Sequence, residues 1–276
     1  MINSAHVAFL DILGFKSFIW SNNHHNVVEA YKTYFIQPVI RQLKEKTFQS
    51  NSKIEALFLS DSIILWTHST EISNLKELIQ LVSLLVGKSI KHGFLLRGAI
   101  VKGPLSILKE SNQTFILGKG LVEAYELQNI QKWVGAILGK GVADCRVCNF
   151  LEEHDLIIKY QVPLKCEQQK EFWCLNWVKF YFPADYYCKI KKKILTSEEV
   201  EELKNTIEDD FYGPNNYFNM HMDIVKLIQQ AQLSEPIRTI KIKQLEKMHE
   251  NINSIKKNTY QFLKNVLLRF GLSLLR

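Results

Sequence analysis

The sequence of 276 residues contains no apolar run long enough to cross a membrane, which takes roughly 18 residues or more. No basic segment precedes the first apolar stretch, so we expect no signal peptide. No internal repeat and no low-complexity linker is present either. Apolar residues nevertheless make up 46% of the chain, which is enough for a packed core. These features predict a folded cytoplasmic protein with no membrane partner.

Cysteine is too irregular in its spacing to build a disulfide framework. The chain has five cysteines, an odd number, and free thiols in a reducing compartment are the simplest interpretation. Cys145 and Cys148 have the spacing of a zinc-ligand pair, but no second pair completes a four-ligand site. We therefore expect neither a zinc site nor a redox role at this pair.

Acidic residues are outnumbered by basic ones, and the formal net charge is +7. Such an excess favours an anionic partner, although nucleic acid, phosphate ligands and anionic proteins all qualify. The basic run 189–193, with the sequence KIKKK, is predicted to be a solvated strand end or turn. We expect no nucleic-acid partner.

The apolar pattern predicts an α+β fold with the ferredoxin-like element order β-α-β-β-α-β, followed by a further helix and strand. The helical stretch after the first strand is interrupted by the polar run 21–26, and Pro38 is a candidate kink. In chain order we expect a strand at 7–11, helix at 14–46, a hairpin at 53–67, helix at 74–92, a strand at 93–105, a strand, turn and helix at 114–128, and a strand at 133–141.

The pattern changes after about residue 150, which divides the chain into a first predicted domain at 1–150 and extra strands with a helical C-terminal region at 151–276. Two strands are expected within 156–165 and 171–181, and helix from 197 onward. Apolar residues near the C-terminus recur at helical spacing, and this stripe fits packing onto the body and dimerisation equally well. The stripe consists of Leu245, Met248, Ile252, Ile255, Phe262 and Val266.

Two aspartates stand where carboxylates are unusual. Asp11 ends an otherwise apolar strand, where an unpaired buried carboxylate is costly. Asp61 lies in the turn of the predicted hairpin, and the ferredoxin-like order brings that hairpin beside the first strand. Two nearby carboxylates repel each other unless cations lie between them, and Mg²⁺ or Mn²⁺ suits such oxygen ligands. The alternative is a helix N-cap at Asp11 and a plain turn residue at Asp61. We favour the metal interpretation.

The residues around the aspartates are consistent with a bound phosphate group. Leu13, Gly14 and Phe15 are predicted to open a helix directly after Asp11, and free backbone N–H groups there would bind phosphates. Arg97 interrupts an apolar strand and needs an anion, which a triphosphate would supply.

Four short motifs carry a family resemblance. FLDILGF, LSDSIIL, RGAIVKG and GKGLVEAYELQ, within residues 5–140, resemble the motifs of class III nucleotidyl cyclase catalytic domains, and most of all the pyrimidine cyclases of bacterial anti-phage Pycsar systems. The resemblance implies that Asp11, Asp61 and the Ile12 carbonyl hold two Mg²⁺ or Mn²⁺ ions and that Arg97 contacts the β- and γ-phosphates. It also implies a homodimer with active sites between the chains, and a separate effector that responds to the cyclic product.

The chain departs from the family pattern at several positions. The late Asn and Arg of the family align with Val122 and Glu126, so Lys102 or Lys119 of a partner chain is a candidate replacement. Leu57 stands at the base-selecting position and cannot hydrogen-bond a purine.

Phe58, next to Leu57, is expected to narrow the pocket for a pyrimidine. UTP or CTP is therefore the predicted substrate, with UTP favoured, and Lys119 joins the expected nucleotide-binding residues. The alternative is a degenerate cyclase fold that binds nucleotide without turnover.

Overall fold

The computed structural model of the protein describes residues 2–16, 19, 23–49, 54–91, 94–111, 113–142, 144–166, 168–212 and 235–272. Within these residues the strands form one sheet of eight strands. They are β1 (Ile2–Ile12), β2 (Ile54–Leu59), β3 (Ser62–Thr67), β4 (Leu96–Glu110), β5 (Gln113–Leu117), β6 (Gly135–Leu138), β7 (Ile157–Pro163) and β8 (Gln169–Leu175).

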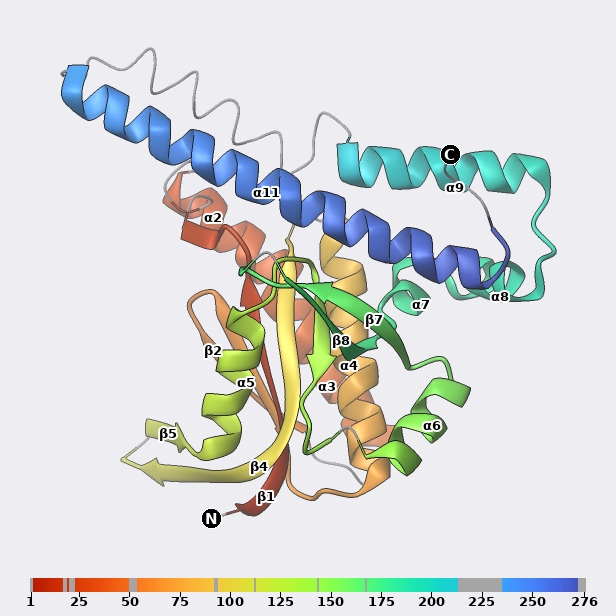
Figure 1. Ribbon diagram of the computed structural model, residues 1–276. Helices are drawn as coiled ribbons and strands as arrows, with labels where there is room; N and C mark the ends of the chain where they lie inside the picture. Colours follow the sequence, from red (N-terminus) through yellow and green to blue (C-terminus); the bar gives the residue numbers. More distant parts are fainter. Residues whose placement is uncertain are drawn as a thin grey trace.

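Helices cover both faces of this sheet and one end of it (Figure 1). They are α2 (His24–Tyr31), the π-helix η1 (Lys32–Ile36), α3 (Gln37–Gln49), α4 (Ile72–Lys91), α5 (Lys119–Asn129), α6 (Cys145–Glu153), α7 (Val178–Tyr181), α8 (Ala184–Lys192), α9 (Ser197–Tyr212) and α11 (Glu235–Arg269). None of these described helices is long and apolar enough to span a membrane.

The expected α+β fold is confirmed. The strands run in the order β2-β3-β1-β4, with antiparallel pairing between β2 and β3, β3 and β1, and β1 and β4. This is the ferredoxin-like arrangement, with β1 at its centre. The sheet continues through β6, which is parallel to β4, and then through β8 and β7. The predicted boundary near residue 150 falls inside α6, whereas the sheet is continuous across it.

The side chains of β1 point alternately to the two faces of the sheet, and each face is covered by a different helix. Leu10 and Ile12 belong to the large core that α4 covers, whereas Val7 and Phe9 face a smaller apolar cluster that includes Ala124 of α5. Because side chains alternate along a strand, Asp11 points to the same face as Phe9. The central strand therefore carries a carboxylate on its α5 side.

Helix α5 sits close to the sheet because two glycines meet there. A Cβ built on Gly103 of β4 would lie 2.9 Å from the Cα of Gly120 in α5. That contact is too short for any side chain, so the close approach depends on glycine. The same helix places Gln128, two turns further along, near the end of β1.

The long helix predicted for 14–46 is not a single α-helix. Leu13 and Gly14 form a turn, α2 begins at His24 after the N-cap Asn23, and η1 separates α2 from α3. Pro38 is the second residue of α3 and directly follows η1 in an unbroken helical stretch, so the irregular π-turn stands beside the proline that lacks an N–H. Apolar spacing alone does not distinguish a continuous helix from short helices with a π-turn between them.

Two further predictions in the C-terminal region are wrong. The strand expected at 171–181 ends at Leu175, and Val178–Tyr181 forms α7 instead. The basic run 189–193 is not a strand end: its first four residues close helix α8, whose buried Tyr187 and Ile190 lie one turn apart, and only Lys193 lies in a turn. Lys193 follows with φ 59°, a left-handed residue that ends the helix.

Helix α11 packs onto the body of the protein. Of its apolar stripe, Ile252, Ile255, Phe262 and Val266 are buried, so packing rather than dimerisation accounts for these four. The Phe262 ring lies 4.8 Å from that of Trp133 and 5.0 Å from that of Tyr160. The side chains of the remaining members, Leu245 and Met248, lie outside the described residues.

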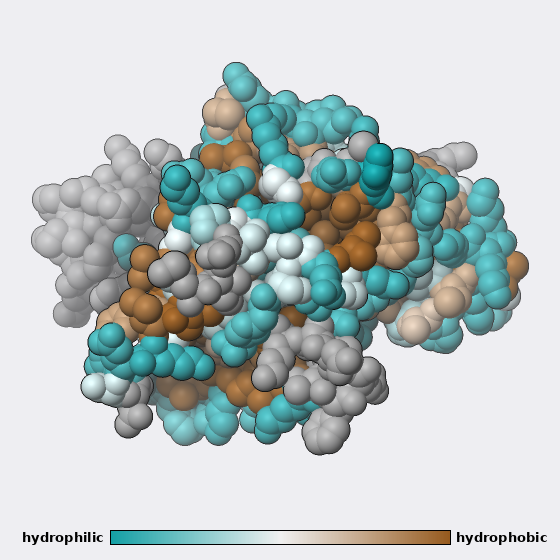
Figure 2. Space-filling model, turned by 90° about the horizontal axis from the view of Figure 1, so that it is seen from below, coloured by the Kyte–Doolittle hydropathy of each residue, from teal (hydrophilic) through white to brown (hydrophobic). Residues whose placement is uncertain are grey.

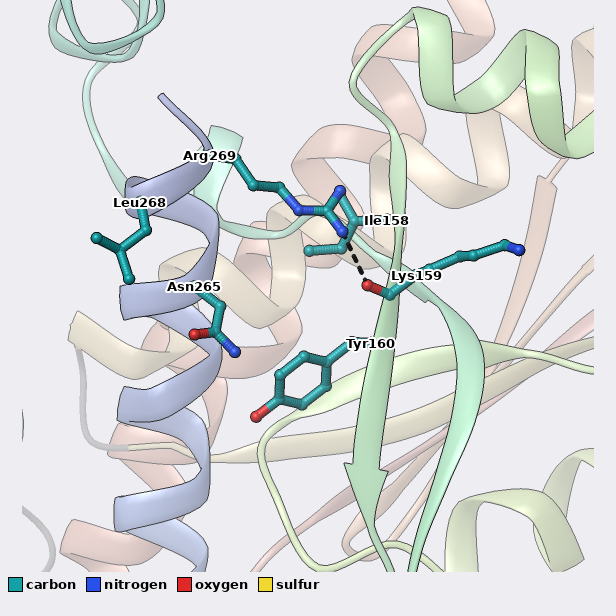
Figure 3. Close-up of a pocket in the computed structure, with 6 residues that line it drawn as sticks. All are labelled: Ile158, Lys159, Tyr160, Asn265, Leu268 and Arg269. Carbon is teal, nitrogen blue, oxygen red and sulfur yellow. Dashed lines mark hydrogen bonds between the residues drawn. The ribbon is translucent and has the colours of Figure 1, made fainter. Parts of the chain in front are cut away.

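The end of α11 also protects the edge of the sheet. Figure 3 shows Arg269 reaching from α11 to β7, where its Nη2 donates to the Lys159 carbonyl at 3.0 Å. Strand β7 is the last in the sheet order, and its outer carbonyls would otherwise face solvent.

Three cysteines carry free thiols, as the sequence analysis predicts. They are Cys166, Cys174 and Cys188. The side chain of Cys145 lies outside the described residues.

The aromatic contacts of α11 predict a large stability contribution. Replacing Phe262 by Ala should lower the free energy of unfolding by about 3 to 5 kcal/mol, because the side chain is fully buried. Urea unfolding would measure this change, with Gln261→Ala as the control, since Gln261 is exposed on the same helix. Equal stability of the two variants would contradict the packing of α11 against Trp133.

Candidate active site

The two predicted carboxylates meet at one end of the sheet. In the register of the strands, Asp11 stands between Ser62 of β3 and Arg97 of β4. Asp61 precedes Ser62 in the hairpin turn, and its carbonyl accepts a hydrogen bond of 2.8 Å from the Ile12 N–H. The sequence prediction that the hairpin brings Asp61 to the end of β1 therefore agrees with the strand pairing.

One oxygen of Asp11 carries two hydrogen bonds. Its Oδ2 accepts from Nη2 of Arg97 at 3.4 Å and from Nε2 of Gln128 at 3.2 Å. Arg97 also donates through Nη1 to the Gln131 carbonyl at 2.8 Å. The Arg97 side chain is only 7% exposed. Asp11 therefore provides negative charge beside the buried Arg97, for which the sequence analysis expected an anionic partner.

The electrostatics of Asp11 reflect burial more than its ion pair. Burial raises the pKa of Asp11 to about 6; Arg97 and Lys165 oppose the rise, and the nearby Asp61 adds to it. Burial likewise lowers the pKa of Arg97 from its usual value. A raised carboxyl pKa beside a second carboxylate is the situation that a divalent cation would relieve.

A buried glutamine fixes the position of Arg97. The Gln131 side-chain amide donates to the carbonyls of Gly98 at 2.9 Å and Leu127 at 2.7 Å, and its Oε1 accepts from Nε1 of Trp133 at 2.8 Å. The next residue, Val134, donates its N–H to the Thr259 hydroxyl of α11 at 2.9 Å. The C-terminal helix therefore supports the segment that positions Arg97.

The hairpin turn that carries Asp61 is held by a tyrosine from α2. Ser60 has φ 52°, a left-handed conformation that is uncommon for serine. The Tyr31 hydroxyl donates a short hydrogen bond to the Ser60 carbonyl. Burial raises the pKa of Tyr31 to about 12, and the proximity of Asp61 adds to the rise.

Lys165 is a cation of this site that the sequence analysis missed. It lies in the turn between β7 and β8, and its Nζ bonds Oδ1 of Asn129, at the end of α5, at 2.6 Å. Its pKa is lowered by burial and by the charge of Arg97, while Asp11 opposes that change. Nothing local in the sequence marks Lys165, because only the extended sheet brings the β7–β8 turn to this place.

The predicted phosphate seat after Asp11 differs from the observed backbone. The Leu13 N–H donates to the Leu95 carbonyl at 2.8 Å, so it is not free for a phosphate. Gly14 has φ 76° and forms a turn, and Phe15 is buried with its ring 5.5 Å from that of Tyr31. A tight turn at Leu13 and Gly14 therefore follows β1, and helical residues begin at Phe15, one residue later than predicted for 14–46.

The two residues proposed to select the base lie on opposite faces of the sheet. Leu57 pairs with Ile64, which pairs with Phe9, so it shares the face of Asp11. Phe58 points to the other face, where its ring lies 6.4 Å from that of Phe35. The expectation that Phe58 narrows a pocket beside Leu57 is therefore wrong, because neighbouring residues of a strand alternate in direction.

The remaining candidates lie away from Asp11, on α5 and on β4. Val122 and Glu126 are exposed on this helix, and Lys119 stands at its first residue, at the opposite end from Gln128. Lys102 is exposed on β4, five residues beyond Arg97 and on the alternate face. Neither lysine is placed beside Asp11 of its own chain.

The donor set fits a magnesium-type ion better than a zinc-type ion. Among the described residues, no group of three His, Cys, Asp or Glu side chains could hold a metal. Mg²⁺ typically takes only one or two protein carboxylates and completes its shell with water and substrate phosphates. Asp11, Asp61 and the Ile12 carbonyl would suffice for such ions, and both hydrogen bonds that Asp11 accepts fall on Oδ2.

Comparison with known proteins gives remote structural likenesses only. No family model and no curated protein matches the chain. The dimeric guanylyl cyclase domain of the RhoGC fusion protein from the fungus Blastocladiella emersonii aligns at TM-score 0.45 and 12% identity, over 63% of this chain and 96% of that one. A bacterial light-regulated adenylyl cyclase aligns at TM-score 0.46 and 14% identity, over 70% and 58%. A Trypanosoma brucei adenylate cyclase aligns at TM-score 0.41 and 11% identity, over 64% and 90%.

The raised pKa of Asp11 predicts how metal binding depends on pH. Because the carboxyl must lose its proton to bind a cation, a pKa of about 6 makes protons compete already below neutral pH. The apparent Mn²⁺ affinity should fall roughly tenfold between pH 7 and pH 5, whereas an ordinary aspartate would change little over that range. Titration of free Mn²⁺ by electron paramagnetic resonance would measure it. A decline that begins only near pH 4 would contradict the burial of Asp11.

Proposed function

We propose that the chain is a nucleotide cyclase that converts UTP or CTP, with UTP favoured, into the 3′,5′-cyclic nucleotide and pyrophosphate. The observation that carries this proposal is the meeting of Asp11 and Asp61 at the end of adjacent strands, next to Arg97 and Lys165. Two carboxylates that would hold divalent ions, flanked by two cations, are suited to a nucleoside triphosphate.

Each residue of the site has a proposed role. Asp11, Asp61 and the Ile12 carbonyl would hold two Mg²⁺ or Mn²⁺ ions, which when bound would activate the ribose 3′-hydroxyl and neutralise the triphosphate. Arg97 orients Asp11 and adds positive charge that favours the β- and γ-phosphates. Positioning and electrostatic stabilisation account for most of such phosphoryl chemistry, and these groups would supply both.

Lys165 is our candidate for the cation that replaces the missing family arginine. Glu126 stands where that arginine aligns and cannot stabilise a developing negative charge. Lys165 is exposed, unlike Arg97, and its charge already acts on Asp11. It would contact the triphosphate from within the same chain, whereas the predicted Lys102 and Lys119 would have to come from a partner.

The choice of a pyrimidine rests on Leu57 alone. Its half-buried side chain shares the face of Asp11 and offers no hydrogen bond to a base edge. An apolar side chain at this position suits a small base that is held by apolar contact. A purine that is recognised by hydrogen bonds would need a lysine or a glutamate there. In the Pycsar systems that the sequence resembles, a cyclic pyrimidine is a second messenger for a separate effector in anti-phage defence, and we extend that role to this chain.

A homodimer is proposed from an apolar surface on α5 and on the β4–β5 arm, at the end of β1 opposite to Asp11. Exposed apolar side chains occur along α5 and on the arm formed by β4 and β5, which lies beside α5 (Figure 1). Figure 2 shows hydrophobic patches among hydrophilic side chains on the side of the molecule where this arm lies. The dimer surface is defined by Leu108, Phe115, Leu117, Val122 and Tyr125.

Turnover with each nucleoside triphosphate tests the proposed activity. With Mn²⁺, the protein should release cyclic UMP or cyclic CMP together with pyrophosphate. Asp11→Asn should lower product formation by roughly a hundredfold or more, because it removes a ligand charge of the metal site. Asp185→Asn, an exposed change on α8, is the matched control.

The other outcomes of this assay are equally decisive. A cyclic purine would keep the mechanism and refute the argument from Leu57. Absence of product with all four triphosphates, while Mn²⁺ and nucleotide still bind, would refute turnover and establish the alternative of a nucleotide-binding module.

A charge at the centre of the dimer surface should separate the chains. Val122 is 56% exposed, so Val122→Asp should leave the fold intact and shift the molar mass measured by light scattering from two chains to one. Activity should fall with it. Ile194→Asp, at an equally exposed residue after α8, should remain dimeric. A wild-type protein that is monomeric at every concentration would contradict the proposed dimer.

A further inference from the structure

A cavity separates two helices on the face of the sheet opposite to Asp11. It has a volume of about 400 Å³ and lies between the η1–α3 segment and α4. Its inner wall is apolar and consists of Phe35, Leu85 and Leu96, each of which is buried. The volume is within the usual range of small-molecule sites, roughly 300 to 1,000 Å³.

Two cations from different helices stand at the rim of this cavity. Arg41 of α3 and Lys88 of α4 both line it and both are exposed. Among the described residues, every other lining side chain is uncharged, so no described carboxylate lines the cavity beside the pair. An apolar wall with two cations at the opening is complementary to an anionic head on an apolar body.

The cavity wall is also connected to the candidate metal site. The Phe35 ring lies 4.9 Å from that of Tyr31, and the Tyr31 hydroxyl bonds the Ser60 carbonyl in the turn that carries Asp61. Leu96 pairs with Ile12 in the sheet and directly precedes Arg97. A ligand against Phe35 and Leu96 therefore touches the supports of both carboxylates without touching the carboxylates themselves.

We propose that the cavity between α3 and α4 binds a small organic anion with an apolar body, and that its occupancy changes the metal affinity of the Asp11–Asp61 site through Phe35 and Tyr31. The binding half of this inference stands on the cavity alone. The coupling half rests on the proposed metal site. The π-turn of η1 contributes Phe35, and π-turns of this kind occur frequently at functional sites.

Calorimetric titration with three probes tests the binding half on the full chain. Decanoate, which has both a carboxylate and an apolar body, should bind once per chain. Decanol lacks the charge and acetate lacks the body, so each should bind at least roughly tenfold more weakly. Arg41→Ala and Lys88→Ala should each weaken decanoate binding roughly fivefold, as expected for an exposed charge pair.

The matched control is Arg146→Ala, which removes an exposed arginine of α6 and should leave decanoate binding unchanged. Decanol that binds as tightly as decanoate, or decanoate binding that is unaffected by both cavity variants, would overturn the anion site. All the substituted side chains are exposed, so the variants are expected to fold.

Manganese titration by electron paramagnetic resonance tests the coupling half without requiring turnover. Saturating decanoate should shift the half-saturating Mn²⁺ concentration of the wild type at least twofold. Tyr31→Phe keeps the ring contact with Phe35 but loses the hydroxyl, so it should bind decanoate normally and show no shift. Identical Mn²⁺ titrations of the wild type with and without decanoate, or a full shift in Tyr31→Phe, would overturn the coupling. Decanoate binding without any Mn²⁺ binding would refute the proposed metal site while leaving the anion site intact.

Discussion

The pairing of Asp11 with Arg97 across β1 and β4 is the interaction on which the rest of the site depends. Both side chains are largely buried at the end of the central strand, and their contact at 3.4 Å is too long to compensate fully for lost hydration. The pKa of Asp11 therefore stays near 6 instead of falling below its ordinary value. A divalent ion would therefore stabilise this buried, incompletely paired carboxylate more than it would stabilise a solvated one.

Several distant parts of the chain serve that pair. Gln128 and Gln131 come from α5 and the segment after it, and Gln131 is fixed in turn by Trp133. Helix α11 then holds the neighbouring Val134 through Thr259. The C-terminal region is consequently part of the support of the site, since removing α11 would free the backbone that accepts from Arg97.

Much of the fold and part of the site could be predicted from residue patterns. The hairpin, α4 and α5 followed from local periodicity and turn residues, and the conspicuous Asp11 followed from its apolar surroundings. The errors have equally specific causes. Val178–Tyr181 looked like a strand because a short apolar run does not reveal its own conformation, and α8 was hidden by its lysines. Phe58 was placed beside Leu57 because consecutive strand residues were read as one surface.

The sequence by itself indicated that two carboxylates could meet at the end of one sheet, since the ferredoxin-like element order places the hairpin beside the first strand. Tertiary structure alone decided what surrounds them. Lys165 reaches the site from a turn more than 150 residues after Asp11, and Tyr31 reaches the Asp61 turn from a helix with no motif to mark it. Such contacts join residues remote in sequence through packing, and no local pattern encodes them.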